Sequence, residues 1–550
     1  MTTPSPHTRP AARAAVSVGE SAPMICNLLG YKPAPHSSES TPNCNLLGYI
    51  AAHTRAAFGA AHVSTFAQIA AFALLAAAPA AQAYIFGDPV TLDGGKLALD
   101  FNARVRVELR ENTFDFNSLT DTANDDTFVL TRFRAGAKYT VSPTLSFYGQ
   151  LQDAREYDSK RPNVPYVNAA EGDDRIDLRQ LYVDVGDPRD SGWSARVGRQ
   201  MIAYGDQRLV GGFEWNNPAR VFDGVKAVYN WADQRTTFDF LATSVVTPGE
   251  TTTDRVKDYK LDRSDKDDLF LGVYVQNSGA IKNTKLDAYL LYRGKTENLP
   301  NYVVPAPAFG NGNVRAFDVP EKIYTLGFRA QNISIAPLKG FDYTVEGAYQ
   351  WGKARPGLPA TTVRGFDWFD HRAYAFHAEA GYTWERVAFV PRVGVEFNYA
   401  SGDKNPGDTK NEGFLNLFHT NHLHYGFMDV FAWKNMESKA VTFRARPFIH
   451  VDNSLKKGVL RLDYHWFSLA RTTDFWYRAN AIAIVRPAAS RTGALPKDAG
   501  REFDATFTWS PSPPYEILLG YSHFDAGDYL AATGRADGAS FSYAQLVLKF

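Results

Sequence analysis

The sequence contains very little cysteine. Its 550 residues include only Cys26 and Cys44, and both precede residue 84. The chain from residue 84 onward therefore cannot form a disulfide, a cysteine-ligated metal site or a dithiol redox centre. Scarce cysteine is also typical of chains that cross an oxidising compartment before they fold.

Long hydrophobic runs and an excess of either charge are absent as well. The mean hydropathy is −0.31 and the formal net charge is +0. A membrane protein built from helices needs several apolar runs of about 20 residues each, so this class is excluded. We expect no nucleic-acid partner, and any charge selectivity must come from where the charges lie rather than from their sum.

The N-terminal region indicates a secretory signal. A short apolar run at 66–80 leads into an A-x-A cleavage site at 81–83, and the run is too short to span a bilayer comfortably. We therefore expect a signal peptide at 53–83 and a mature chain at 84–550. The preceding residues, 1–52, form an extension that repeats CNLLGY and to which the sequence assigns no role.

Apolar and polar residues alternate along most of the mature chain. From residue 99 to 110, odd-numbered residues are apolar and even-numbered residues are charged or Asn. Because successive side chains of a strand point to opposite faces, each such segment has one apolar and one polar wall. The candidate strands lie near 97–110, 127–139, 144–156, 175–186, 193–204, 221–232, 235–247, 269–278, 284–294, 322–333, 341–352, 372–384, 388–400, 438–452, 457–469, 501–510, 515–525 and 540–550.

The pattern predicts an all-β fold, a transmembrane antiparallel β-barrel of about 18 strands in the outer membrane of a Gram-negative bacterium. Short turns near 187–190 and 510–514 alternate with long polar loops, of which the one near 401–436 is expected to cap the outer mouth. Segment 425–433 is assigned to a loop because such barrels have even strand numbers. Phe550 closes the last alternating strand and is the expected signal for the barrel-assembly machinery.

Arginine recurs on the polar face, which lines the lumen of a barrel. A guanidinium stays charged and binds carboxylates with two donors, so a ladder of them suits an anionic saccharide, above all a polyuronate. Two alternatives stay open, namely a general porin for small anions and a plugged structural or adhesion barrel. The candidate pathway residues are Arg104, Arg106, Arg132, Arg134, Arg179, Arg199, Arg329, Arg444, Arg446 and Arg461.

No arrangement of residues predicts catalysis. His419, His422 and His424 cluster in a predicted loop, but no cysteine or suitably spaced carboxylate completes a metal site there. We predict no enzymatic activity, no bound metal and no cofactor.

Three segments resemble the alginate-export porins: Leu178–Val185 (LRQLYVDV), Val197–Val225 and Gly402–Asp429. The resemblance extends over nearly the whole mature chain. It implies a monomeric barrel with the strand number predicted above, whose arginine-rich constriction passes alginate, a polymer of mannuronate and guluronate. One departure is clear, because the family's exporter has arginines on the penultimate strand, whereas 515–525 reads YEILLGYSHFD. This leaves room for another acidic glycan or smaller anions. By the same resemblance the constriction and early lumenal arginines would be Arg104, Arg132 or Arg134, Arg179 and Arg199.

Overall fold

A computed structural model of the chain describes residues 90–119, 125–160, 174–187, 191–247, 261–296, 321–333, 339–354, 368–481, 484–486 and 493–550. All of them belong to one compact unit, Pro79–Phe550. The predicted signal peptide at 53–83 and the extension at 1–52 lie outside the described residues and stay predictions. In the described part of the chain, no helix is long and apolar enough to cross a membrane.

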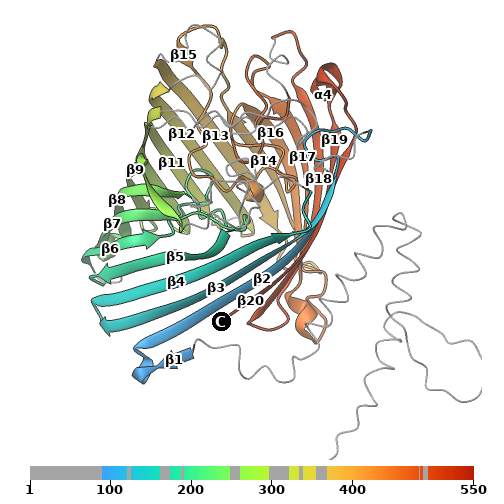
Figure 1. The fold of residues 1–550 in the computed structure, drawn as a ribbon. Helices are drawn as coiled ribbons and strands as arrows, with labels where there is room; N and C mark the ends of the chain where they lie inside the picture. Colours follow the sequence, from blue (N-terminus) through green and yellow to red (C-terminus); the bar gives the residue numbers. More distant parts are fainter. Residues whose placement is uncertain are drawn as a thin grey trace, which may run out of the picture. The chain divides into compact units, whose positions relative to one another are not determined.

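The described strands form one closed antiparallel barrel (Figure 1). Its sheet has 20 strands, of which β1 (Val90–Leu92) and β15 (Lys410–Asn411) are short additions, and the other 18 form the wall. Each wall strand pairs with the next, and the last pairs with the first, Arg104 opposite Val547. The wall strands are β2 (Leu97–Glu111), β3 (Asp126–Ser142), β4 (Leu145–Tyr157), β5 (Asp174–Val185), β6 (Gly192–Gln200), β7 (Phe222–Trp231), β8 (Thr236–Thr247), β9 (Arg263–Asn277), β10 (Thr284–Lys295), β11 (Glu321–Asn332), β12 (Phe341–Ala354), β13 (Phe369–Thr383), β14 (Arg392–Ala400), β16 (Met436–Ala445), β17 (Val459–Leu469), β18 (Asp498–Trp509), β19 (Tyr515–Ala526) and β20 (Ala539–Lys549). The one α-helix among the described residues is α4 (Asp528–Thr533).

The predicted barrel is confirmed, and each predicted strand has its counterpart in the wall. Segment 425–433 lies in a loop, as expected. The strand ends differ most where alternation stops: β9 begins at Arg263 rather than near 269, because its first residues, RSDKDD, have no apolar side. The strand predicted at 438–452 ends at Ala445.

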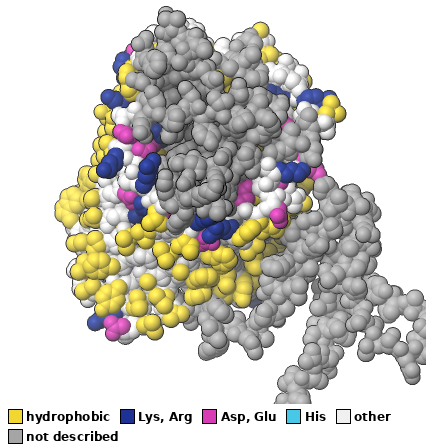
Figure 2. Space-filling model, viewed as in Figure 1, with side chains coloured by type: hydrophobic (Ala, Val, Ile, Leu, Met, Phe, Trp, Pro, Cys, Tyr) yellow, Lys and Arg dark blue, Asp and Glu magenta, His cyan; other side chains and the backbone are white. Residues whose placement is uncertain are grey.

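The wall has an apolar outer face and a polar inner face. On β3, Phe133 keeps 43% of its surface exposed, whereas its neighbours Arg132 and Arg134 keep 5% and 8%. Figure 2 shows hydrophobic side chains gathered on the outer surface over β2–β6. An apolar belt of this kind is what a barrel presents to lipid.

Aromatic side chains gather near both ends of the wall strands. Trp193 packs on Tyr229 near the end that carries short turns, with ring centroids 5.1 Å apart. Tyr324 stacks on Trp351 near the end that carries long loops, at 5.6 Å. Two aromatic girdles at these levels are typical of barrels whose ends lie at the membrane interfaces.

Two of the long loops fold into the barrel. One joins β6 to β7 (201–221) and the other joins β14 to β16 (401–435), and they meet where Val210 bridges Phe418. Trp433 is fully buried, and Phe431 stacks on Phe467 of β17 with centroids 4.5 Å apart. The second loop, expected to cap the outer mouth, thus packs against the inner wall because its apolar side chains find a core there.

Candidate functional site

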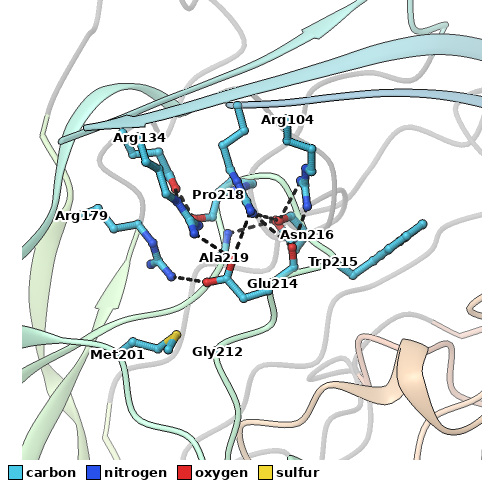
Figure 3. Close-up of polar contacts among 12 residues, drawn as sticks. Arg104, Arg134, Arg179, Met201, Gly212, Glu214, Trp215, Asn216, Pro218 and Ala219 are labelled. Atoms are coloured by element: carbon cyan, nitrogen blue, oxygen red, sulfur yellow. Dashed lines mark hydrogen bonds and ion pairs between the residues drawn. The ribbon is translucent and has the colours of Figure 1, made fainter. Parts of the chain in front are cut away.

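Four lumenal arginines come together on the β2–β5 side of the barrel. Arg104 lies on β2, Arg132 and Arg134 on β3, and Arg179 on β5. Strand alternation directs all of them inward, and the register places Arg104 opposite Arg132. All four side chains are buried. Arg104, Arg134 and Arg179 converge on one loop segment (Figure 3), and Arg132 bonds to the same segment. We call these four residues the arginine cluster.

The β6–β7 loop places the carboxylate of Glu214 at the centre of the arginine cluster. Its Oε2 lies 3.1 Å from Arg132 Nη2 and 2.8 Å from Arg134 Nη1. Its Oε1 lies 2.9 Å from Arg179 Nη2. Three guanidiniums thus share one carboxylate, each through a single nitrogen, and none makes the two-donor pair that arginine favours.

Arg104 and its neighbour on the inner face of β2, Arg106, hold the backbone of the loop. Arg104 donates to the carbonyl of Glu214 (2.7 Å) and to the side-chain oxygen of Asn217 (3.0 Å). Arg106, next along the inner face of β2, donates to the carbonyl of Trp215 (2.7 Å), and its guanidinium lies 3.7 Å from the centre of the Trp215 ring. These bonds fix the loop independently of the Glu214 carboxylate.

The arginine cluster carries more positive charge than its single acid compensates. Among the described residues, Glu214 is the one carboxylate that forms an ion pair with any of the four guanidiniums. Each guanidinium also has a buried nitrogen without a hydrogen-bond partner among the described residues. These donors are Arg104 Nε, Arg132 Nε, Arg134 Nη2 and Arg179 Nε.

Glu214 remains ionised in this environment. Burial deep in the barrel raises the pKa of its carboxyl, but the charges of Arg134, Arg179 and Arg132 outweigh burial and hold that pKa well below its usual range. The side chain still keeps 40% of its surface exposed. The Glu214 carboxyl can be surrounded by protein and still have one face open to solvent, because the lumen of a barrel admits water.

A second set of contacts anchors the same loop on the opposite wall. Asp206 pairs with Arg329 of β11 at 2.6 Å. Arg208 lies 4.0 Å from Glu346 of β12 and 3.9 Å from Glu396 of β14. Since β12 is halfway round the ring from β3, the loop spans the lumen from wall to wall.

The other predicted pathway arginines do not join the arginine cluster. Arg106 pairs with Glu108 at 2.6 Å, and Arg461 pairs with Asp463 on the inner face of β17. Arg444 lies opposite Arg461 in the register and is exposed. Arg446 requires a correction, because β16 ends at Ala445 and this residue lies in the connection that follows.

Arg199, predicted for the constriction, is also placed differently. It lies opposite Leu181, which exposes 53% of its surface on the outer side of the barrel. Its guanidinium pairs with Asp223 of β7 at 2.9 Å. The preceding residue of the G-R-Q sequence, Gly198, has φ +128°, and a Cβ there would lie 2.2 Å from the carbonyl oxygen of Leu181. The glycine therefore serves close strand pairing.

The three loop histidines do not form a metal site. His419 contacts the carbonyl of Asn416, His422 bonds Asp429 at 3.0 Å, and His424 bonds the carbonyl of Asp206 at 2.7 Å. Among the described residues, one set of three carboxylates has the spacing of metal ligands, with an oxygen of each within 4.8 Å of the others. Its members are Asp174, Asp177 and Asp262.

The sequence reasoning missed the loop residues of the site, Glu214 and Asp206 above all. Alternation identifies strand residues and is silent about loops. One signal was present: the segment between β6 and β7 contains Leu209, Val210 and Trp215, and such residues are unusual in a loop that only faces water.

A closed barrel with an apolar outer wall and a charged inner wall is the architecture of an outer-membrane channel. The model of one protein family, described as alginate export, matches residues 96–543. The chain therefore belongs to the alginate export family, which confirms the resemblance seen in the sequence and the outer-membrane location. This family and this fold are those of transport barrels.

Solved structures of similar fold come from Pseudomonas aeruginosa. OccK9 (OpdG) has a TM-score of 0.51 and 10% identity, with 82% of this chain and 98% of that chain covered. OccK11 (OpdR) has a TM-score of 0.46 and 11% identity, with 84% and 98% covered. OccK2 (OpdF), solved in complex with glucuronate, has a TM-score of 0.47 and 9% identity, with 83% and 96% covered. The OccK9 likeness supports the barrel fold. No curated protein matches the chain.

Proposed function

We propose that this barrel is an outer-membrane channel for acidic saccharides and catalyses no reaction. The observation that carries the proposal is the arginine cluster, in which three of the four guanidiniums share the single carboxylate of Glu214. Surplus positive charge in a low-dielectric lumen lowers the cost of bringing an anion inside. A polyuronate such as alginate carries one carboxylate on each sugar, so it meets this charge repeatedly as it advances.

The lumen-spanning loop makes the arginine cluster harder to bypass. Because the loop is held on one wall through the carbonyls of Glu214 and Trp215 and on the other through Asp206, a solute must pass close to one of these walls. On the first wall it meets the arginine cluster, whose one ion-paired acid is Glu214. A solute carboxylate can bind the guanidiniums there, but it competes with Glu214 for them. Binding is therefore favourable enough for entry and weak enough for release.

Ion selectivity in planar bilayers tests this proposal. We expect the reversal potential under a salt gradient to show that the wild-type channel prefers anions. The double variant Arg132→Ala with Arg179→Ala removes two of the four charges and should lower the anion-to-cation permeability ratio by roughly tenfold.

Arg155→Ala is the matched control, because Arg155 pairs with Asp153 at 2.6 Å on the outer face of β4. Its permeability ratio should equal that of the wild type. A wild-type channel that prefers cations would overturn the proposal. An anion-selective channel whose chloride current is unaffected by glucuronate would instead be a general porin for small anions.

A plugged structural barrel is the second candidate, and the inward-folded loops favour it. Residues such as Trp433 and Phe431 fill part of the interior with an apolar core. Single-channel recording separates the two candidates, because a plugged barrel inserts into the bilayer without producing current steps.

A further inference from the structure

The contacts of Glu214 are the contacts that a uronate would make. The carboxylate of an acidic sugar has the same charge and the same two oxygens as the Glu214 side chain. Arg132, Arg134 and Arg179 come from two different strands and direct one donor each at the Glu214 oxygens. A free carboxylate in the place of this group would meet the same three donors.

The loop does not depend on this carboxylate for its position. Arg104 and Arg106 hold its carbonyl groups, and Asn217 Nδ2 donates to the carbonyls of Thr131 (3.2 Å) and Arg155 (3.1 Å) on β3 and β4. Rotation of the Glu214 side chain away from the arginines therefore leaves the backbone bonds of the loop in place.

Gln152 keeps the receiving site in shape when the carboxylate leaves. Its Oε1 accepts from Arg134 Nε at 2.7 Å, and its Nε2 donates to Asp174 (2.9 Å) and to the carbonyl of Pro218 (2.8 Å). Arg134 is thus oriented by a neighbour other than Glu214, so its remaining donors stay directed at the same place.

Solvent reaches these ion pairs from the side of Glu214. The side chain of Glu214 is 40% exposed, whereas those of Arg132, Arg134 and Arg179 are 6%, 9% and 3% exposed. An anion in the lumen therefore meets the acid first and reaches the arginines by taking its place.

We propose that Glu214 is a built-in counter-ion that the carboxylate of a passing acidic saccharide replaces on Arg132, Arg134 and Arg179. This inference rests on the proposed function and specifies how its site works. The exchange conserves the number of ion pairs, so no arginine is left buried and unpaired, a state that costs several kcal/mol. Because Glu214 occupies the arginines for most of the time, the apparent affinity for the saccharide equals the intrinsic affinity multiplied by the fraction of time that the site is open. The lower apparent affinity favours release.

Block of single-channel chloride current by sodium glucuronate tests the exchange. The measured quantity is the glucuronate concentration that halves the current, with glucose as the uncharged sugar control. Glu214→Gln keeps the size and one acceptor oxygen but removes the charge, so it competes less well for the arginines. We expect the half-blocking concentration to fall about tenfold in this variant, since charge-assisted hydrogen bonds are roughly twice as strong as neutral ones.

Asp153→Asn is the matched control, because Asp153 is also an arginine-bound acid but lies on the outer face of β4. Glucuronate should block this variant with the same half-blocking concentration as the wild type. Glu214→Asp retains the charge on a side chain one methylene shorter, and we expect its half-blocking concentration to lie between those of the wild type and Glu214→Gln. This variant carries the test if Glu214→Gln does not fold.

The possible results distinguish failure of the exchange from failure of the proposed function. A half-blocking concentration that is unchanged or higher in Glu214→Gln, with wild-type channels anion-selective and blocked by glucuronate, overturns the exchange and leaves the proposed function intact. In that case Glu214 is a structural anchor of the loop. Wild-type channels that prefer cations or ignore glucuronate overturn the proposed function and the exchange together.

Discussion

At the scale of single residues, burial and charge act on Glu214 in opposite directions. Burial raises the pKa of a carboxyl group, but three guanidiniums at 2.8–3.1 Å lower it further than burial raises it. Because the folded pKa lies below the ordinary glutamate value, the ion pairs stabilise the folded loop at every pH above that value. This contribution is lost only as the pH falls through the lowered folded pKa.

The pH dependence of glucuronate block follows from this sign. The ratio of half-blocking concentrations between wild type and Glu214→Gln should be the same at about pH 7 and about pH 5, because Glu214 stays ionised over this range. Measuring the ratio isolates Glu214 from other acids of the lumen, which both proteins share. A ratio that approaches one as the pH falls to about 5 would show that the pKa of the Glu214 carboxyl is raised above its ordinary value, and would contradict this account.

Individual arginines were predictable from the sequence to the extent that a strand holds them. Alternation placed Arg104, Arg132 and Arg134 on the inner face because their neighbours on both sides are apolar or small. Arg179 was assigned to the polar face by the same alternation, and the family resemblance added its role in the constriction, although it lies beside a register shift between β4 and β5. Glu214 was not predictable, because its position depends on a loop path that no local pattern encodes.

At the scale of elements, the β6–β7 loop acts as a strut across the lumen. Its chain bends sharply next to Glu214, since Phe213 has φ +54° and Ala219 has φ +65°. Positive φ at such residues costs of order 1 kcal/mol or more each, so the contacts on both walls must hold the loop in this path. Each wall strand, in contrast, carries its alternating pattern within its own residues, so this pattern was readable from the sequence alone.

Removing the strut should widen the channel. In a variant with residues 206–217 replaced by a short Gly-Ser linker, the links from Glu214 to Arg134 and from Asp206 to Arg329 are lost together. We expect the single-channel conductance to rise severalfold while the strand content measured by circular dichroism stays unchanged. A conductance equal to that of the wild type would mean that the β14–β16 loop, and not the strut, limits the current.

At the scale of the whole barrel, the two ends of the strut meet walls of different charge. The β2–β5 side offers the arginine cluster with Glu214 as its one ion-paired acid. Near the opposite wall Arg208 and Arg329 are outnumbered by four carboxylates, those of Asp206, Asp287, Glu346 and Glu396. The zero net charge of the sequence therefore conceals a difference between the two ends of the strut, since guanidiniums gather around Glu214 and carboxylates gather around Arg208 and Arg329. Composition cannot reveal this division.

This division predicts how anion selectivity depends on salt. Charges act over about 10 Å in 0.1 M salt but only about 3 Å in 1 M salt, so only solutes touching the arginine cluster feel it at high salt. The anion-to-cation permeability ratio should fall towards one between these concentrations, whereas block by glucuronate, which requires direct contact with guanidiniums, should weaken less. Reversal potentials and half-blocking concentrations measured on the same channels at both concentrations provide the comparison. If selectivity and block weaken in parallel, so that the half-blocking concentration rises by the factor by which the permeability ratio falls, glucuronate is attracted only by the general field of the lumen, and the proposal of direct binding at the arginine cluster is wrong.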